Sequence, residues 1–227
     1  MTCVVAVAKD GVVYIGADSC GSTPTSAMVV TNPKVFIVDT RFIIGVCASF
    51  RAIDLLQHSL KVPKQPSAQS DDAFMRTIFI TAVRETFSKN GFPRMDSDDE
   101  VSFLVGYRGR VYCVEDDYSV INPLEWGHSI GSGAEAARGS LWTSQESPDI
   151  TARIMVALQA SEAMTPSVRG PFTVEQLPKY KRKETVEQRL ARKAEMADAK
   201  VASGEFEKSL GEMSDEERNQ ALYGDTD

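Results

Sequence analysis

Three pairs of apolar segments, each joined by a short turn, constrain the fold of this chain most strongly. The segments are rich in β-branched and aromatic residues, and the turns hold Gly or Asp, which suit hairpin geometry. Two such segments joined by a tight turn pair antiparallel, so the pattern predicts β-hairpins. Apolar residues occupy both faces, and we therefore expect sheets that are buried on both sides. The predicted pairs are 2–8 with 12–17, 34–38 with 42–47, and 101–107 with 110–114.

Segments with helical periodicity alternate with these hairpins. The clearest is 71–89, because Ser70 can cap its start and the acidic pair Asp71 and Asp72 suits the positive end of a helix dipole. Its apolar side chains fall near one face, as in a helix that packs on a sheet. Shorter helices are predicted over 49–60 and 134–142, and loops over 92–100 and 117–128.

A further helix is predicted over 149–164. Ser147 is its expected cap, and Pro148 occupies its expected first position, where the missing N–H costs nothing. The segment that precedes the 134–142 helix is rich in glycine, which predicts a tight turn before that helix.

The composition changes after Pro178, and this divides the chain into an expected domain, 1–178, and a charged, mainly helical tail, 179–227. Large apolar residues become rare in the tail, so it cannot form a core alone. Its apolar residues form a narrow helical stripe. Either the tail is a solvated or loosely docked extension, or it is an arm that binds a partner or neighbouring subunit. The stripe consists of Val186, Leu190, Ala194, Ala197 and Val201.

Bulk composition narrows the classes of function. Of the 227 residues, 42% are hydrophobic and 25% charged, which is ordinary for a globular protein. The formal net charge of -7 argues against nucleic-acid binding through overall charge. No apolar run approaches the roughly 20 residues that span a bilayer, so no membrane partner is expected. The N-terminal apolar run ends at Lys9 and lacks a basic segment before it, which is not typical of a signal peptide.

The cysteines and histidines offer little for a metal site. No two cysteines form a C-x-x-C pair, which argues against a zinc knuckle or a disulfide framework and favours a reducing compartment such as the cytoplasm. The only histidines are His58 and His128. We expect no metal and no cofactor. The cysteines are Cys3, Cys20, Cys47 and Cys113.

The N-terminus carries the first indication of chemistry. Thr2 follows Met1 and opens the first predicted strand, and its small side chain permits removal of the initiator methionine. Thr2 would then hold a hydroxyl and a free α-amine, and the amine could act as general base on that hydroxyl. Thr2 is therefore a candidate nucleophile.

Such a nucleophile needs a nearby cation and a backbone donor. A lysine ammonium would stabilise developing negative charge, and a carboxylate would hold that lysine in place. Lys34 and Asp18 have the right types and lie at the ends of predicted strands. The N–H of Ser49, where a strand leads into a helix, could receive the oxyanion.

Several of these features, in this order and spacing, resemble the proteasome β-subunit family and, within it, the bacterial HslV-type peptidase. The resemblance covers about residues 2–175. It implies an α+β fold, a four-layer αββα sandwich of the N-terminal-nucleophile class. It also implies roles by position: Thr2 as nucleophile, Asp18 as the carboxylate that orients the lysine, Lys34 as the activating lysine, and Ser132 as a hydroxyl near the Thr amine. The matching segments are Thr2, which directly follows Met1, and residues 16–19, 33–35, 44–48 and 130–133.

The chain departs from the family pattern in three places. Ser49 and Phe50 stand where the family usually has two glycines, and Phe50 would narrow a substrate channel. A later Asp of the family has no clear match in the region of 164–167. The tail 179–227 is foreign to the compact bacterial peptidase.

Three functions stay open at this point. The resemblance implies a threonine peptidase that acts on unfolded polypeptides in a closed homo-oligomeric ring, with an ATP-driven unfoldase as partner. The departures favour a catalytically inactive structural or assembly protein instead, such as a bacteriophage protein associated with the virion. An amidase that acts on a small molecule is a third hypothesis, for which the sequence indicates no substrate pocket.

Overall fold

The computed structural model describes residues 2–22, 26–47, 49–92, 101–180, 193–196 and 199. The chain divides into two compact units, Met1–Tyr180 and Lys181–Asp227. In the second unit the described residues 193–196 are helical. The predicted stripe over 186–201 falls largely outside the described residues, and so does the predicted loop 92–100, of which only Phe92 is described. The first unit is a mixed α/β structure built on antiparallel sheets.

Two larger sheets and one small one make up the strands of this unit. The four-stranded sheet has the order β10-β1-β2-β11, the five-stranded sheet has the order β5-β6-β7-β8-β9, and β3 pairs with β4. Every described pair is antiparallel. The bounds are β1 Cys3–Lys9, β2 Val12–Ala17, β3 Cys20–Ser22, β4 Ala27–Val29, β5 Val35–Val38, β6 Phe42–Val46, β7 Phe103–Tyr107, β8 Arg110–Val114, β9 Val120–Ile121, β10 His128–Gly131 and β11 Thr173–Leu177.

The three predicted hairpins are present as β1–β2, β5–β6 and β7–β8. Their turns use left-handed backbone angles, with φ of 80° at Gly11, 51° at Asp39 and 79° at Gly109. Gly adopts such angles without a steric penalty, and Asp tolerates them better than most residues. The turn residues read from the sequence therefore fix where each strand reverses.

The helices also follow the sequence pattern. The predicted helix over 71–89 is continuous but contains a π-helical stretch, Met75–Phe79, between α2 and α3. As expected, the Ser70 hydroxyl caps it by accepting a hydrogen bond from Ala73 N at 3.2 Å. In the described part of the chain, no helix is both long and apolar enough to cross a membrane. The helices are α1 Phe50–His58, α2 Asp71–Phe74, α3 Ile80–Lys89, α4 Ala134–Thr143 and α5 Ile150–Met164.

Two local predictions were wrong. Asp149, rather than Ser147, caps α5, because its backbone is extended and its Oδ1 accepts from Ala152 N at 2.9 Å. The predicted loop 117–128 contains β9 and the first residue of β10. Both strands are too short to show a periodicity, and each forms only by pairing with a longer neighbour, β8 or β1.

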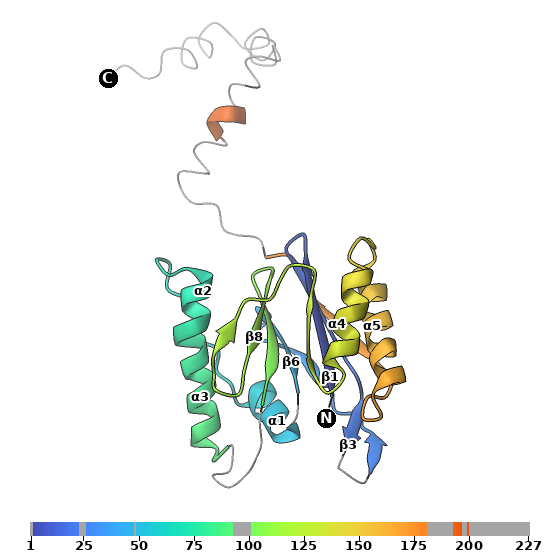
Figure 1. The fold of residues 1–227 in the computed structure, drawn as a ribbon. Coiled ribbons are helices and arrows are strands. Elements are labelled where there is room, and N and C mark those ends of the chain that lie inside the picture. The colour runs from blue at the N-terminus through green and yellow to red at the C-terminus, as the bar shows by residue number, and fades with distance from the viewer. Residues whose placement is uncertain are drawn as a thin grey trace, which may run out of the picture. The chain divides into compact units, whose positions relative to one another are not determined.

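Three clusters of buried apolar side chains fill the spaces between the helices and the sheets. One lies between α1–α3 and the five-stranded sheet, a second between the two larger sheets, and a third between the four-stranded sheet and α4–α5. Figure 1 shows the corresponding order, with α3 and α5 at opposite sides and the strands between them. Both larger sheets are thus covered on both faces, which agrees with their continuous apolar strands.

The two sheets approach each other closely at Gly45 of β6. A Cβ built there would lie 2.5 Å from Cγ1 of Val4 and 2.8 Å from Cγ2 of Ile15, two residues of the opposite sheet. A substituent of any size would therefore force the sheets apart. In contrast, a Cβ at the exposed Gly139 of α4 would meet nothing within 4 Å.

We expect Gly45→Ala to lower the free energy of unfolding by about 1–3 kcal/mol through overpacking. Gly139→Ala should raise it by about 0.5–1 kcal/mol, because alanine favours a helix interior over glycine. Urea denaturation measures the free energy of unfolding of both variants. Equal changes in the two variants would contradict the close approach of the sheets at Gly45.

The corrected cap of α5 gives a second test. Asp149→Ala should destabilise the protein by about 0.5–2 kcal/mol, since it removes the acceptor of the Ala152 N–H. Ser147→Ala serves as the control and should change stability by less than about 0.5 kcal/mol. If thermal denaturation shows a larger loss of stability for Ser147→Ala than for Asp149→Ala, Ser147 is the cap of α5 after all.

Candidate active site

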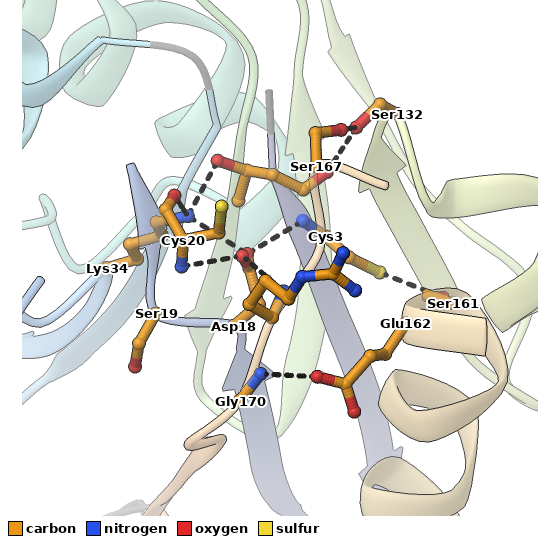
Figure 2. Close-up of polar contacts among 12 residues, drawn as sticks. Cys3, Asp18, Ser19, Cys20, Lys34, Ser132, Ser161, Glu162, Ser167 and Gly170 are labelled. Atoms are coloured by element: carbon orange, nitrogen blue, oxygen red, sulfur yellow. Dashed lines mark hydrogen bonds and ion pairs between the residues drawn. The ribbon is translucent and has the colours of Figure 1, made fainter. Parts of the chain in front are cut away.

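Thr2, Asp18 and Lys34 meet at one end of the two larger sheets. Lys34 Nζ donates hydrogen bonds to Thr2 Oγ1 at 2.9 Å and to Asp18 Oδ1 at 2.9 Å. Its third acceptor is the carbonyl oxygen of Cys20, at 2.6 Å. Figure 2 shows Lys34 and Asp18 pointing toward each other, with Cys20 beside them. The side chains of Lys34 and Asp18 are 2% and 0% exposed, so this is a buried ion pair.

The topology explains why residues so far apart in the sequence converge. Thr2 directly precedes β1 and Asp18 directly follows β2. The antiparallel register pairs Val4 with Ala17, so Asp18 lies opposite Cys3, and Thr2 is the next residue along the chain. Lys34 directly precedes β5 in the other sheet. The packing of the two sheets therefore brings the lysine to the hairpin that carries the threonine and the aspartate.

The Asp18 carboxylate is held by backbone donors as well as by the lysine. Oδ1 accepts from Cys3 N at 3.0 Å, and Oδ2 accepts from Cys20 N at 2.9 Å and from Arg169 N at 3.5 Å. Several N–H donors stabilise a buried carboxylate and fix its orientation. Sequence reasoning missed the Cys20 carbonyl and the Arg169 N–H, since backbone groups leave no signature in residue types.

Ser132 lies close to the backbone of Thr2. Its hydroxyl donates to the Thr2 carbonyl oxygen at 3.4 Å, and Gly133 N donates to the same oxygen at 3.4 Å. Gly131 is needed here, because its φ is 93° and a Cβ would collide with the Thr2 carbonyl. The Gly-rich segment 131–133 thus lets β10 pass directly beside Thr2.

A second hydroxyl, which sequence reasoning did not select, accompanies Ser132. Ser167 Oγ lies 3.0 Å from Ser132 Oγ and is buried, and Figure 2 shows the two hydroxyls side by side. Ser167 belongs to the segment in which the family's later Asp has no counterpart. A neutral hydroxyl therefore stands beside Ser132 in this chain.

Cys3 lies next to Thr2 but is a poor nucleophile. Its thiol donates to Ser161 Oγ at 3.3 Å, and burial raises its pKa to about 11. A thiol that stays protonated near neutral pH reacts weakly. Burial also raises the pKa of Cys113, and all four cysteines are buried thiols that form no disulfide. In the described part of the chain, no group of three or more His, Cys, Asp or Glu residues could hold a metal ion.

Ser49 caps α1 beside the site, and its hydroxyl accepts from Ala52 N at 3.4 Å. The predicted use of its backbone N–H for an oxyanion stays a prediction. The next residue, Phe50, lines a small pocket of about 70 Å³, which we call the Thr2 pocket. The pocket is lined by Thr2, Cys20, Gly21, Ser22, Lys34, Val46, Phe50 and Ile53.

Comparison with known proteins supports the fold. BPH from Thiobacillus denitrificans superposes with a TM-score of 0.66 at 16% identity, over 80% of this chain and 100% of that chain. A second structure of BPH, in complex with epoxomicin, has a TM-score of 0.63 at 17% identity, over 79% and 100%. HslV from Trypanosoma brucei has a TM-score of 0.59 at 16% identity, over 77% and 98%.

Anbu from Pseudomonas aeruginosa, solved as a helical assembly, has a TM-score of 0.59 at 15% identity, over 94% of this chain and 97% of that chain. No family model matches the sequence, and no curated protein matches it. At these identities the likeness shows a shared fold. This chain therefore has the fold of proteasome-like β-subunits of the HslV type.

The buried ion pair gives a testable consequence for stability. Lys34→Met leaves the Asp18 carboxylate without its cation and should lower the free energy of unfolding by about 3–5 kcal/mol. The exposed pair of Lys89 and Glu85, whose nitrogen and oxygen lie 3.2 Å apart, provides the control. Lys89→Met should cost less than about 0.5 kcal/mol. If urea denaturation gives similar losses for both variants, the Lys34 pair is not buried as described.

Proposed function

We propose that this protein is a threonine-type N-terminal-nucleophile peptidase in which Thr2 attacks polypeptide substrates. One observation carries the proposal: Lys34 Nζ lies 2.9 Å from Thr2 Oγ1 and 2.9 Å from the buried Asp18 carboxylate. The order of helices, sheet, sheet and helices in Figure 1 supports the αββα sandwich of this class for residues 1–178.

The hydrogen bonds of Lys34 indicate which group accepts the proton. An ammonium has three N–H donors and no acceptor, and Lys34 has three acceptors in Thr2 Oγ1, Asp18 Oδ1 and the Cys20 carbonyl. Lys34 thus stabilises negative charge on Oγ1 and does not act as the base. The remaining base is the α-amine of Thr2, which becomes available when Met1 is removed.

The reaction then proceeds in two steps. The amine takes the proton from Oγ1, Oγ1 bonds to the carbonyl carbon of the substrate, and the peptide C–N bond breaks as the leaving amine receives that proton. A water molecule, deprotonated by the same amine, hydrolyses the resulting ester and restores the Thr2 hydroxyl. In this scheme Asp18 positions Lys34, the Ser49 N–H binds the oxyanion, and Ser132 fixes the backbone of Thr2.

The proposal extends to assembly and partners. We propose a cytoplasmic homo-oligomer, either a closed ring or a helical array such as the one formed by Anbu of Pseudomonas aeruginosa. The exposed side chains of Trp142 and Val156 on α4 and α5 are candidates for subunit contacts. An ATP-dependent unfoldase, engaged through the tail 179–227, would supply unfolded substrates.

A second candidate function is that of an assembly protein without turnover, for instance in a virion. In such a protein the ion pair of Lys34 and Asp18 would serve the fold alone. The Asp18 carboxylate accepts hydrogen bonds from the N–H groups of Cys3, Cys20 and Arg169 and so holds three chain segments together. Phe50 in the wall of the Thr2 pocket also reduces the room for substrate. Under this alternative Met1 stays in place and Thr2 has no free amine.

Intact mass spectrometry with and without epoxomicin, an epoxyketone, separates the two functions. For a peptidase we expect loss of Met1 and a single covalent adduct per chain. Thr2→Ala should give no adduct, and Lys34→Met should slow its formation about 10²–10³-fold, the usual effect of removing one electrostatic stabiliser. Thr151→Ala, an exposed threonine on α5, is the matched control and should react like the parent protein.

A retained Met1 together with an unreactive parent protein would exclude the peptidase. If the oligomer measured by native mass spectrometry is unchanged in Thr2→Ala at the same time, the assembly function takes its place. Circular dichroism of each variant distinguishes loss of reactivity from loss of fold.

A further inference from the structure

The Thr2 pocket has features that select a particular kind of substrate side chain. From these features we infer that the protein cleaves after residues with small uncharged side chains, such as alanine and serine, and that Phe50 sets this size limit. The inference rests on the proposed function, since it assigns the substrate class of the same site. It concerns the wall of the pocket and not the residues that react.

The position of the pocket decides which substrate residue it receives. A carbonyl carbon that Thr2 Oγ1 attacks must lie about 3–3.5 Å from that oxygen. The side chain of the residue that supplies the carbonyl is attached to the Cα that is bonded to the reacting carbon. Because Thr2 and Lys34 themselves line the pocket, that side chain enters it.

The volume of the pocket limits what fits. It measures about 70 Å³, roughly half of the ~150 Å³ cavity that accepts a benzene ring. A methyl or hydroxymethyl group fits this space, whereas a leucine or phenylalanine side chain requires the walls to move. Protein interiors resist such movement, because close-packed side chains have few alternative positions.

Phe50 forms the wall that faces β3. It is the first residue of α1 and its side chain is 39% exposed. A Cβ built at Gly21 would lie 3.4 Å from both Cε2 and Cζ of Phe50, so the tip of the ring reaches the backbone of β3. The ring therefore reaches from α1 to β3 beside Thr2, and its removal would enlarge the pocket without disturbing the buried core.

The Lys34 ammonium decides which charges the pocket accepts. It already has three acceptors, so it offers no free donor to an acidic side chain. Its positive charge also repels a basic side chain. The pocket therefore disfavours charged residues of either sign.

The experiment uses the full chain and four fluorogenic peptides that differ only in the residue before the scissile bond: serine, alanine, leucine or phenylalanine. We expect kcat/KM for serine and alanine to exceed that for leucine and phenylalanine at least tenfold, because one misfitting methylene group alone is worth about 10–200-fold. Phe50→Ala should raise the ratio of kcat/KM for leucine to that for alanine about tenfold.

Leu124→Ala provides the control, because Leu124 is an exposed apolar side chain, 70% exposed, outside the Thr2 pocket. It should leave all four values unchanged. An active parent enzyme that prefers leucine or phenylalanine would overturn the inference and leave the peptidase intact, as would an unchanged leucine-to-alanine ratio in a folded Phe50→Ala variant. No cleavage of any peptide, together with no epoxomicin adduct, would overturn the proposed function and this inference with it.

Discussion

The buried ion pair between Lys34 and Asp18 is the interaction on which the rest of the site depends. Burying two charges is expensive, and the cost is offset only when both partners are hydrogen-bonded on all sides. Here the carboxylate accepts from backbone N–H groups as well as from the ammonium, and the ammonium also binds the Cys20 carbonyl and Thr2 Oγ1. This network fixes the position of the Thr2 hydroxyl.

The network is possible only because the two sheets pack closely. Thr2 and Asp18 come from one sheet and Lys34 from the other, and Gly45 removes the side chain that would hold the sheets apart. Gly131 has a similar effect beside Thr2, where β10 passes within contact distance of the threonine backbone. Glycines thus control how the site is assembled, although they contribute no chemistry.

The contacts among Lys34, Asp18 and Thr2 would stabilise the fold in an assembly protein and would also support the chemistry of a peptidase. The two proposed functions differ only at the N-terminus and in the pocket beside Thr2. A free amine on Thr2 would complete the set of groups that acyl transfer requires. In the proposed peptidase, Phe50 in the wall of the Thr2 pocket would limit the size of the substrate side chain. Phe50 has no polar side-chain group, so a substitution there removes none of the hydrogen bonds of Lys34 and Asp18.

The sequence by itself determined the hairpins, most helix positions and the types of residue at the site. Turn glycines and aspartates mark where strands reverse, and local periodicity marks helices, because both are set by backbone geometry over a few residues. The convergence of Thr2, Asp18 and Lys34 was expected from a family resemblance and not from any local pattern.

Only the tertiary structure decided the short strands β3, β4, β9, β10 and β11, which exist because a neighbouring strand pairs with them. It also decided the cap of α5, the hydroxyl of Ser167 beside Ser132, and the wall that Phe50 forms across from β3. These features depend on contacts between segments far apart in the chain, and such contacts leave no trace in local sequence because they are fixed by how the sheets and helices pack.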